Sequence, residues 1–130
     1  MKRWIVAAML GLGAQAGAQT LDGKAVFAAN CAACHQATGA GIPGAFPALK
    51  GNRFVQGDPD AVITTVLMGR GGMPTFAESI DDAQLAQVIS YIRQGWGNQA
   101  EPVSPQAVQA VRHKVNASEV LRPDAPANAH

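Results

Sequence analysis

Apolar residues recur at the spacing of an α-helix in three stretches of the chain, which indicates an all-α protein. The first stretch runs from Leu21 to Asn30, and Asp22 is placed to cap its first turn. The second runs from Pro59 to Met68, with Asp58 as the N-cap and its proline at the first helical position, where the missing N–H costs no hydrogen bond. The positions of this second helix that we expect to face inward are Val62, Ile63, Val66 and Leu67.

The third stretch has the strongest helical pattern. It begins with a cap at Asp81 or Asp82, ends before two glycines, and carries an apolar stripe formed by Leu85, Val88, Ile89 and Ile92. Between the helices, Gly39–Gly57 and Gly69–Pro74 are rich in glycine and proline, so both are predicted loops. No segment alternates apolar and polar residues with a sustained period of two, so we predict no sheet.

Both ends of the chain differ from this helical middle. Lys2 and Arg3 precede an apolar run about half as long as the roughly 20 residues that span a bilayer, and small residues follow up to Ala18. We therefore predict that residues 1–18 are a cleaved signal peptide and that the mature chain, if bacterial, is periplasmic. Residues 19–100 would form the folded domain, and the proline-rich residues 101–130 an extension. A short helix from Ser104 to Val115 can form there before a mobile tail.

Composition and charge narrow the class of protein. A chain of 130 residues has room for one small domain. Charged residues make up only 15% and aromatic residues 5%, so a bound apolar group would add bulk to a modest core. Removal of Lys2 and Arg3 leaves 8 basic against 9 acidic side chains, and no basic patch suggests nucleic-acid binding. No other segment is long and apolar enough for a membrane span in the mature chain.

The two cysteines of the chain stand in the segment Cys31-Ala32-Ala33-Cys34-His35. A thioredoxin-like pair needs a βαβ setting, zinc normally takes four protein ligands, and a disulfide across so short a loop adds little stability. The pattern suits covalent haem attachment, because two thiols one helical turn apart can add to the two vinyl groups of a single haem. The segment therefore predicts one haem c held by Cys31 and Cys34, with His35 as an axial ligand of its iron.

A second axial ligand decides whether such an iron carries electrons or binds small molecules. The candidates are Met68, Met73, His113 and His130. Met68 lies on the apolar face of a predicted helix, where methionine usually fills the core, and both histidines are expected at the surface. Met73 lies in a glycine-rich loop, 38 residues after His35, and glycine lets the backbone approach a flat group closely. We therefore predict Met73 as the second ligand.

Taken together, these residues resemble the class I c-type cytochromes over roughly Leu21 to Asn98. Gly23 and Phe27 match the first helix of that family, so the resemblance implies that they touch Val88 and Tyr91 of the last helix. The implied fold is a cytochrome c-like arrangement of three to five helices around one covalently bound haem.

The resemblance also implies particular haem contacts. The segment from Phe46 to Gly51 matches the stretch that follows the haem motif in the family. By that match, the Pro47 carbonyl accepts the Nδ1–H of His35, and Leu49 packs on the haem. The candidates to bond the haem propionates lie beside the loops expected to contact haem, and they are Arg70, Lys50, Asn52 and Arg53.

The expected function is that of a periplasmic mono-haem c-type cytochrome. It would carry single electrons between a donor dehydrogenase or reductase and an acceptor oxidase, as an electron carrier rather than an enzyme. Its redox protein partners would bind transiently. Two alternatives stay open. In the first alternative, the chain is a dedicated subunit that docks on one dehydrogenase through residues 101–130. In the second, Met73 is not an iron ligand and the chain is an open-site haem sensor or peroxidase-like protein.

Overall fold

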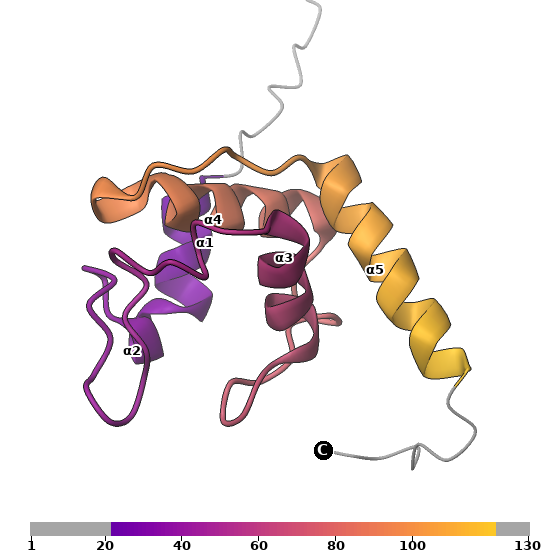
Figure 1. Cartoon of the computed structure of the whole chain (residues 1–130), viewed down its shortest axis with the longest axis horizontal. Coiled ribbons are helices and arrows are strands. Elements are labelled where there is room, and N and C mark those ends of the chain that lie inside the picture. The colour runs from indigo at the N-terminus through magenta and orange to yellow at the C-terminus, as the bar shows by residue number, and fades with distance from the viewer. Residues whose placement is uncertain (1–21, 122–130) are drawn as a thin grey trace, which may run out of the picture.

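The computed structural model describes residues 22–121, which form five α-helices and one short 3₁₀-helix (Figure 1). The elements in chain order are α1 (Gly23–Asn30), α2 (Ala32–His35), α3 (Pro59–Met68), α4 (Asp82–Gln94), η1 (Gly95–Gly97) and α5 (Pro105–Val120). Pairing of the β type within residues 22–121 is limited to two isolated bridges, Ile42 with Phe46 and Arg70 with Met73. The all-α prediction is confirmed. The predicted signal peptide, His130 and the predicted mobile tail beyond Leu121 lie outside the described residues.

Polar side chains cap the N-termini of α1, α3, α4 and α5 at the positions that the sequence predicts. Asp22 and Asp58 each accept a hydrogen bond at 3.0 Å from the backbone N–H two residues further on. Of the two aspartates considered for α4, Asp81 is the cap, and it forms a reciprocal capping box with Gln84. Ser104 caps α5, because its hydroxyl oxygen accepts a hydrogen bond from the Ala107 N–H at 3.1 Å. No helix within the described range 22–121 is long and apolar enough to cross a membrane.

The core forms where α1 crosses α4. Gly23 is buried in this crossing, and a side-chain carbon at its position would collide with the carbonyl of Gln87 and with the Cβ of Tyr91. The close approach also brings Phe27 of α1 to Tyr91, with ring centroids 5.5 Å apart, and Trp96 joins them at 5.2 Å from Phe27. The predicted contacts of Gly23 and Phe27 with Tyr91 are therefore confirmed.

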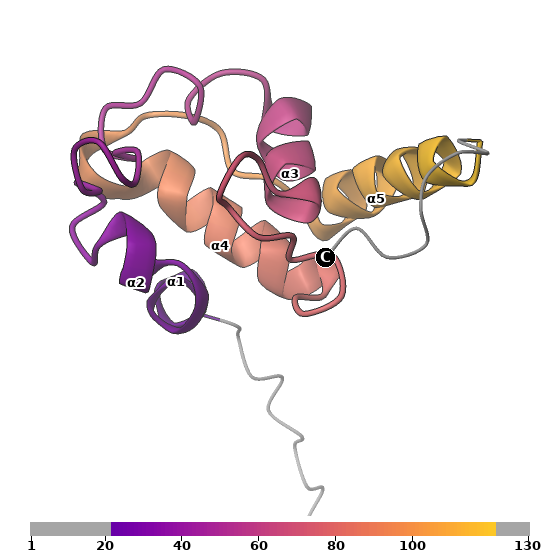
Figure 2. The ribbon, with the colours of Figure 1, turned by 90° about the horizontal axis from the view of Figure 1, so that it is seen from below.

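The apolar stripe of α4 is buried between the other helices. Seen from below, α1 and α2 lie to one side of α4, and α3 and α5 lie to the other (Figure 2). The extension contributes to this core, because Val108 and Val111 of α5 are 0% and 3% exposed. The helix that begins after Ser104 is thus part of the packed domain, and it ends at Val120 rather than at Val115.

One residue expected in the core lies at the surface. Met68 is the last residue of α3 and is 42% exposed, whereas Leu67 before it is fully buried. Each residue turns an α-helix by about 100°, so Met68 points away from the face that buries Ile63 and Leu67. The interpretation of Met68 as a core filler is wrong.

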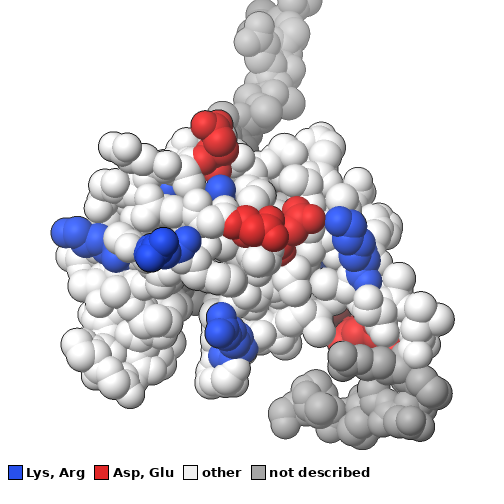
Figure 3. All heavy atoms as spheres, viewed as in Figure 1, with Lys and Arg blue, Asp and Glu red and all other residues white. Residues whose placement is uncertain are grey.

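Two loops extend from the same side of α4 in Figure 1: residues 36–57 between α2 and α3, and residues 69–81 between α3 and α4. The space-filling view shows the surface hollowed between them (Figure 3). The first loop is tied to α4 by the buried Arg93, which donates to the carbonyls of Val55 at 2.8 Å and Gly57 at 3.0 Å. The sequence did not single out Arg93. The helices therefore hold two loops on either side of one hollow.

Replacing Gly23 with alanine is expected to lower the free energy of unfolding by about 1–3 kcal/mol, because the added methyl group forces α1 away from α4. The matched control is Gly95→Ala at the end of α4, where φ is −79° and no atom lies within 4 Å of the added carbon. We expect the control to change stability by less than about 0.5 kcal/mol. Denaturant unfolding followed by circular dichroism measures both, and equal losses would contradict a close crossing at Gly23.

Candidate functional site

The two cysteines and His35 are placed by a short second helix. The chain bends at Cys31, where φ is −121° and ψ is −34°, and then forms α2. The backbone N–H groups of Cys34 and His35 donate to the Cys31 carbonyl at 3.2 and 2.9 Å, so the cysteines stand one helical turn apart. Both thiols are free and half-buried, and His35 is only 9% exposed.

The thiol chemistry argues against a redox-active pair. Burial, and to a lesser extent the neighbouring Cys34, raises the pKa of the Cys31 thiol to about 11. Cys31 is therefore protonated at neutral pH, whereas reactive Cys-x-x-Cys pairs have a lowered thiol pKa.

His35 is held in one orientation by the first loop. Its Nδ1 lies 2.9 Å from the Pro47 carbonyl oxygen, the contact that the family resemblance implies. A carbonyl can only accept, so Nδ1 carries the proton and Nε2 is the nitrogen left with a free lone pair. Gly41, at φ +64°, lies directly against Pro47, and a side-chain carbon there would be 2.6 Å from the Pro47 carbonyl carbon. The loop can therefore close onto His35 only with glycine at this position.

Residues that follow α4 fix this loop at two places, at Ala37 near its start and at Leu49 to Gly51 further along. The Trp96 indole N–H donates to the Ala37 carbonyl at 3.2 Å. The buried Asn98 donates to the Leu49 carbonyl at 3.0 Å and accepts from the Gly51 N–H at 2.8 Å. Sequence reasoning missed the role of Asn98, since only the folded chain brings it 47 residues back to Gly51. Leu49 itself is half-buried against the core.

Met73 lies in the second loop, which is tied back to α3. Its backbone pairs with that of Arg70, with N···O distances of 3.0 and 3.2 Å, so the two intervening glycines form a tight turn. The Thr75 hydroxyl donates to the carbonyl of Leu67, and the N–H of Phe76 donates to that of Val66 at 3.1 Å. These bonds satisfy carbonyls that the end of α3 would otherwise leave unpaired. Met73 is half-buried in this turn.

The four candidates for binding propionates differ in whether their side chains are already bonded elsewhere. Arg70 is exposed, and its guanidinium carbon lies 5.7 Å from the centre of the Phe54 ring, which leaves its N–H groups available. Asn52 is committed to its own turn: its side chain accepts from the Phe54 N–H at 2.9 Å and donates to the Ala48 carbonyl at 2.8 Å. Lys50 and Arg53 are exposed, as is His113 on α5. Asn52 is thus the one of the four whose side chain is already bonded within its own turn.

The donor set fits a flat apolar group better than a free metal ion. Within residues 22–121 there is no cluster of three or more His, Cys, Asp or Glu side chains that could hold an ion. The same residues expose six large apolar side chains, and three of them belong to the first loop: Ile42, Phe46 and Phe54. Two thiols, one oriented imidazole and exposed apolar side chains on the loop that orients it are what a covalently held haem requires.

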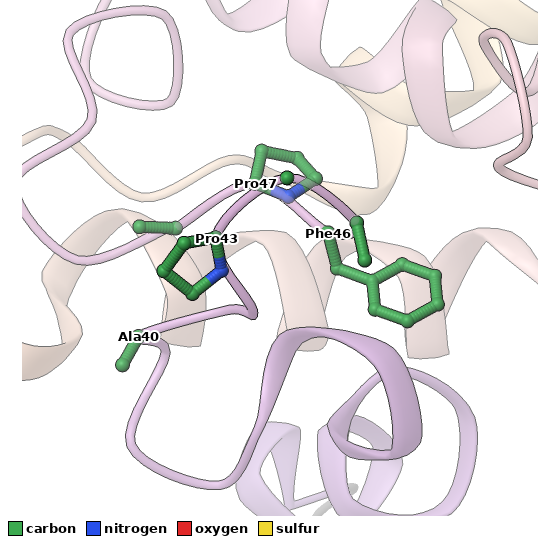
Figure 4. A pocket seen from close by; sticks show the side chains of 7 residues that line it. Ala40, Pro43, Phe46 and Pro47 are labelled. Carbon is green, nitrogen blue, oxygen red and sulfur yellow. The ribbon is translucent and has the colours of Figure 1, made fainter.

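A hollow of about 310 Å³ in the first loop is lined only by Ala40 and residues 43–48. Figure 4 shows that the Phe46 ring points away from Ala40 and Pro43. The hollow is not lined by Cys31, Cys34, His35 or Met73, so it is a depression in the surface of the loop beside the candidate site.

Comparison with known proteins gives independent evidence. Residues 18–92 match the sequence profile of the family described as "Cytochrome C oxidase, cbb3-type, subunit III". The chain is 34% identical to cytochrome c-552 of Thermus thermophilus, over 88% of each protein. It is 37% identical to cytochrome c6 of Leptolyngbya boryana, over 61% of this chain and 100% of the relative.

A further similarity is to part of a larger protein. The chain is 34% identical to the cytochrome c subunit of the alcohol dehydrogenase (quinone) of Gluconobacter oxydans, over 74% of this chain. The match covers 23% of that subunit, so the chain spans less than a quarter of the relative's length.

Asn98→Ala is expected to lower the free energy of unfolding by about 2–3 kcal/mol, because it leaves buried backbone groups of the first loop and of α4 without partners. The neighbouring Gln99 is exposed, so Gln99→Ala is the control and should change stability by less than about 0.5 kcal/mol. Denaturant unfolding measures both. A loss at Asn98 no larger than at Gln99 would contradict the proposed tie between α4 and the loop.

Proposed function

The chain belongs to the cytochrome c family, and we propose that it is a periplasmic mono-haem carrier of single electrons between a dehydrogenase or reductase and an oxidase. Family membership brings one covalently bound haem c and an electron-carrying role without catalysis of its own. Bound haem c supplies an iron centre that accepts and returns one electron.

We propose that Cys31 and Cys34 hold the haem through thioether bonds and that His35 and Met73 are its axial ligands. The observation that supports this most strongly is the buried His35 imidazole, whose Nδ1 is committed to the Pro47 carbonyl at 2.9 Å. That bond leaves Nε2 as the donor for iron, fixes the ring orientation and raises the basicity of the imidazole.

The second ligand is expected to decide between electron transfer and small-molecule binding. A Met73 thioether that stays on the iron closes the site and raises the reduction potential. The Met73 turn is bonded to the end of α3, which supports retention of the ligand in both oxidation states. Leu49 would add an apolar contact to the haem, and Arg70 would bond a propionate through its free N–H groups.

The location is proposed from the N-terminal pattern. Residues 1–18 combine basic residues, an apolar run and small residues before Gln19. The mature protein recovered from a periplasmic fraction should therefore begin at Gln19 by mass spectrometry. An uncleaved N-terminus in the cytoplasmic fraction would contradict this part of the proposal.

Redox proteins that bind transiently are the proposed partners. Similar proteins include the cytochrome c subunit of an alcohol dehydrogenase, the cytochrome subunit of a fructose dehydrogenase, and cytochromes c-552 and c6. Docking on one dehydrogenase through residues 101–130 is the alternative. Deleting that whole segment would also remove Val108 and Val111 from the core, so the sharper test deletes only residues 122–130. A lower rate of reduction by the partner would favour docking, and an unchanged rate would favour the free carrier.

The visible spectrum of the purified mature protein tests haem, attachment and ligation together. The oxidised protein should show weak far-red absorption from an iron–sulfur bond, and the reduced protein should bind CO poorly. Tight CO binding by the unmodified protein would overturn the assignment of Met73 and favour an open-site haem sensor or peroxidase-like protein.

Met73→Ala should remove the far-red absorption, lower the reduction potential and increase CO affinity by at least about tenfold, because the iron loses its sixth ligand. Met68→Ala is the matched control. Since Met68 is exposed, it should leave the spectrum and CO affinity unchanged and cost less than about 1 kcal/mol of stability. The same spectral change in both variants would contradict the assignment.

A further inference from the structure

The segment that joins the Met73 loop to α4 has few backbone bonds of its own. Between Phe76 and α4 the chain forms turns, in which the N–H groups of Ser79 and Ile80 both donate to the Phe76 carbonyl at 3.2 Å. Between Met73 and this segment, Thr75 and Phe76 are bonded to carbonyls at the end of α3. The order of residues 77–81 therefore depends on contacts from outside the segment.

Ile80 is buried in the core, and the polar contacts of the segment with α5 come from one arginine. The guanidinium of Arg112 donates to the carbonyls of Ala77 and Ile80, the latter at 2.9 Å, and its Nε lies 2.7 Å from Asp82 Oδ1. The side chain is 21% exposed, so these charge-assisted bonds are partly protected from water. A planar guanidinium can serve three acceptors at fixed angles, which a lysine ammonium cannot reproduce.

We propose that Arg112 is a positioning residue for the Met73 loop: it fixes residues 77–82 on α5 and so keeps Met73 at the iron. The inference rests on the proposed function. It gives α5 a role at the haem site, although no residue of that helix is among the proposed ligands. The stretch that follows Met73 is then held twice, at Thr75 and Phe76 by α3 and at residues 77–82 by α5.

The same helix supplies a control ion pair. Lys114 lies 3.2 Å from Asp60 on α3, so this ion pair joins α5 to α3 rather than to residues 77–82, and the two side chains are 70% and 52% exposed. Exposed pairs of this kind contribute little. Lys114→Ala therefore removes a charge from α5 without touching the Met73 loop.

The experiment compares four variants of the haem-loaded protein: Arg112→Ala, Arg112→Lys, Lys114→Ala and Val111→Ala. Val111 is 3% exposed, so the last variant destabilises α5 without removing a polar bond to the loop. Hydrogen exchange by NMR is followed at the amides of Phe76, Ser79, Ile80 and His35, together with the rate of CO binding to the reduced protein.

Arg112→Ala should raise exchange at Phe76, Ser79 and Ile80 and the CO binding rate by about tenfold, the equivalent of one charge-assisted hydrogen bond, with His35 exchange unchanged. Arg112→Lys should give a smaller change in the same direction. Lys114→Ala should match the unmodified protein, and Val111→Ala should raise exchange at all four amides alike.

An unchanged CO rate in Arg112→Ala, or a uniform change like that of Val111→Ala, would overturn the proposal. Failure of the proposed function would show differently, as tight CO binding by the unmodified protein. In that case the exchange pattern alone decides whether Arg112 orders the segment.

Discussion

The close crossing of α1 and α4 at Gly23 is the constraint on which the rest of the structure depends. At Gly23 the backbone of α1 lies directly against the Gln87 carbonyl and the Tyr91 Cβ, which occupy the place of a Gly23 side-chain carbon. Because α2 follows α1 after a single residue, the crossing also sets the position of the cysteines and His35. Trp96, which follows α4, packs on Phe27 at the same junction. One contact between helices thus relates the haem-binding segment to the residues that hold its loop.

Both proposed iron ligands depend on bonds made at helix ends. The loop that orients His35 is held by Arg93, Trp96 and Asn98, at and after the end of α4. The loop that carries Met73 is held by carbonyls at the end of α3 and by Arg112. Apart from the exposed Trp96–Ala37 bond, these bonds involve buried or half-buried groups, whose loss leaves a polar atom without a partner. They therefore matter more than the exposed Lys114–Asp60 pair, which contributes less than about 1 kcal/mol.

Local features were predictable because their signals lie within a few residues. Helix α3 begins and ends where predicted, since Asp58 and Pro59 start it and Gly69 follows it. The hydrogen bond from His35 to Pro47 was also predicted, from the family resemblance. The surface position of Met68 was missed, although the turn of about 100° per residue places it away from the face that buries Ile63 and Leu67. The length of α5 was missed for a different reason: burial of Val108 and Val111 stabilises a helix with a weak pattern of its own.

The sequence by itself determined α1, α3 and α4, their caps and the Cys31 to His35 segment, because each rests on residue types at short fixed spacings. Only the tertiary structure decided which polar side chains hold the loops. Asn98 meets Gly51 from 47 residues away, and Arg112 meets Ala77 from 35 residues away. Nothing in the local sequence distinguishes such residues from ordinary surface residues, since their acceptors are backbone carbonyls that every residue carries. The packing of α4 and α5 is what brings those carbonyls within reach.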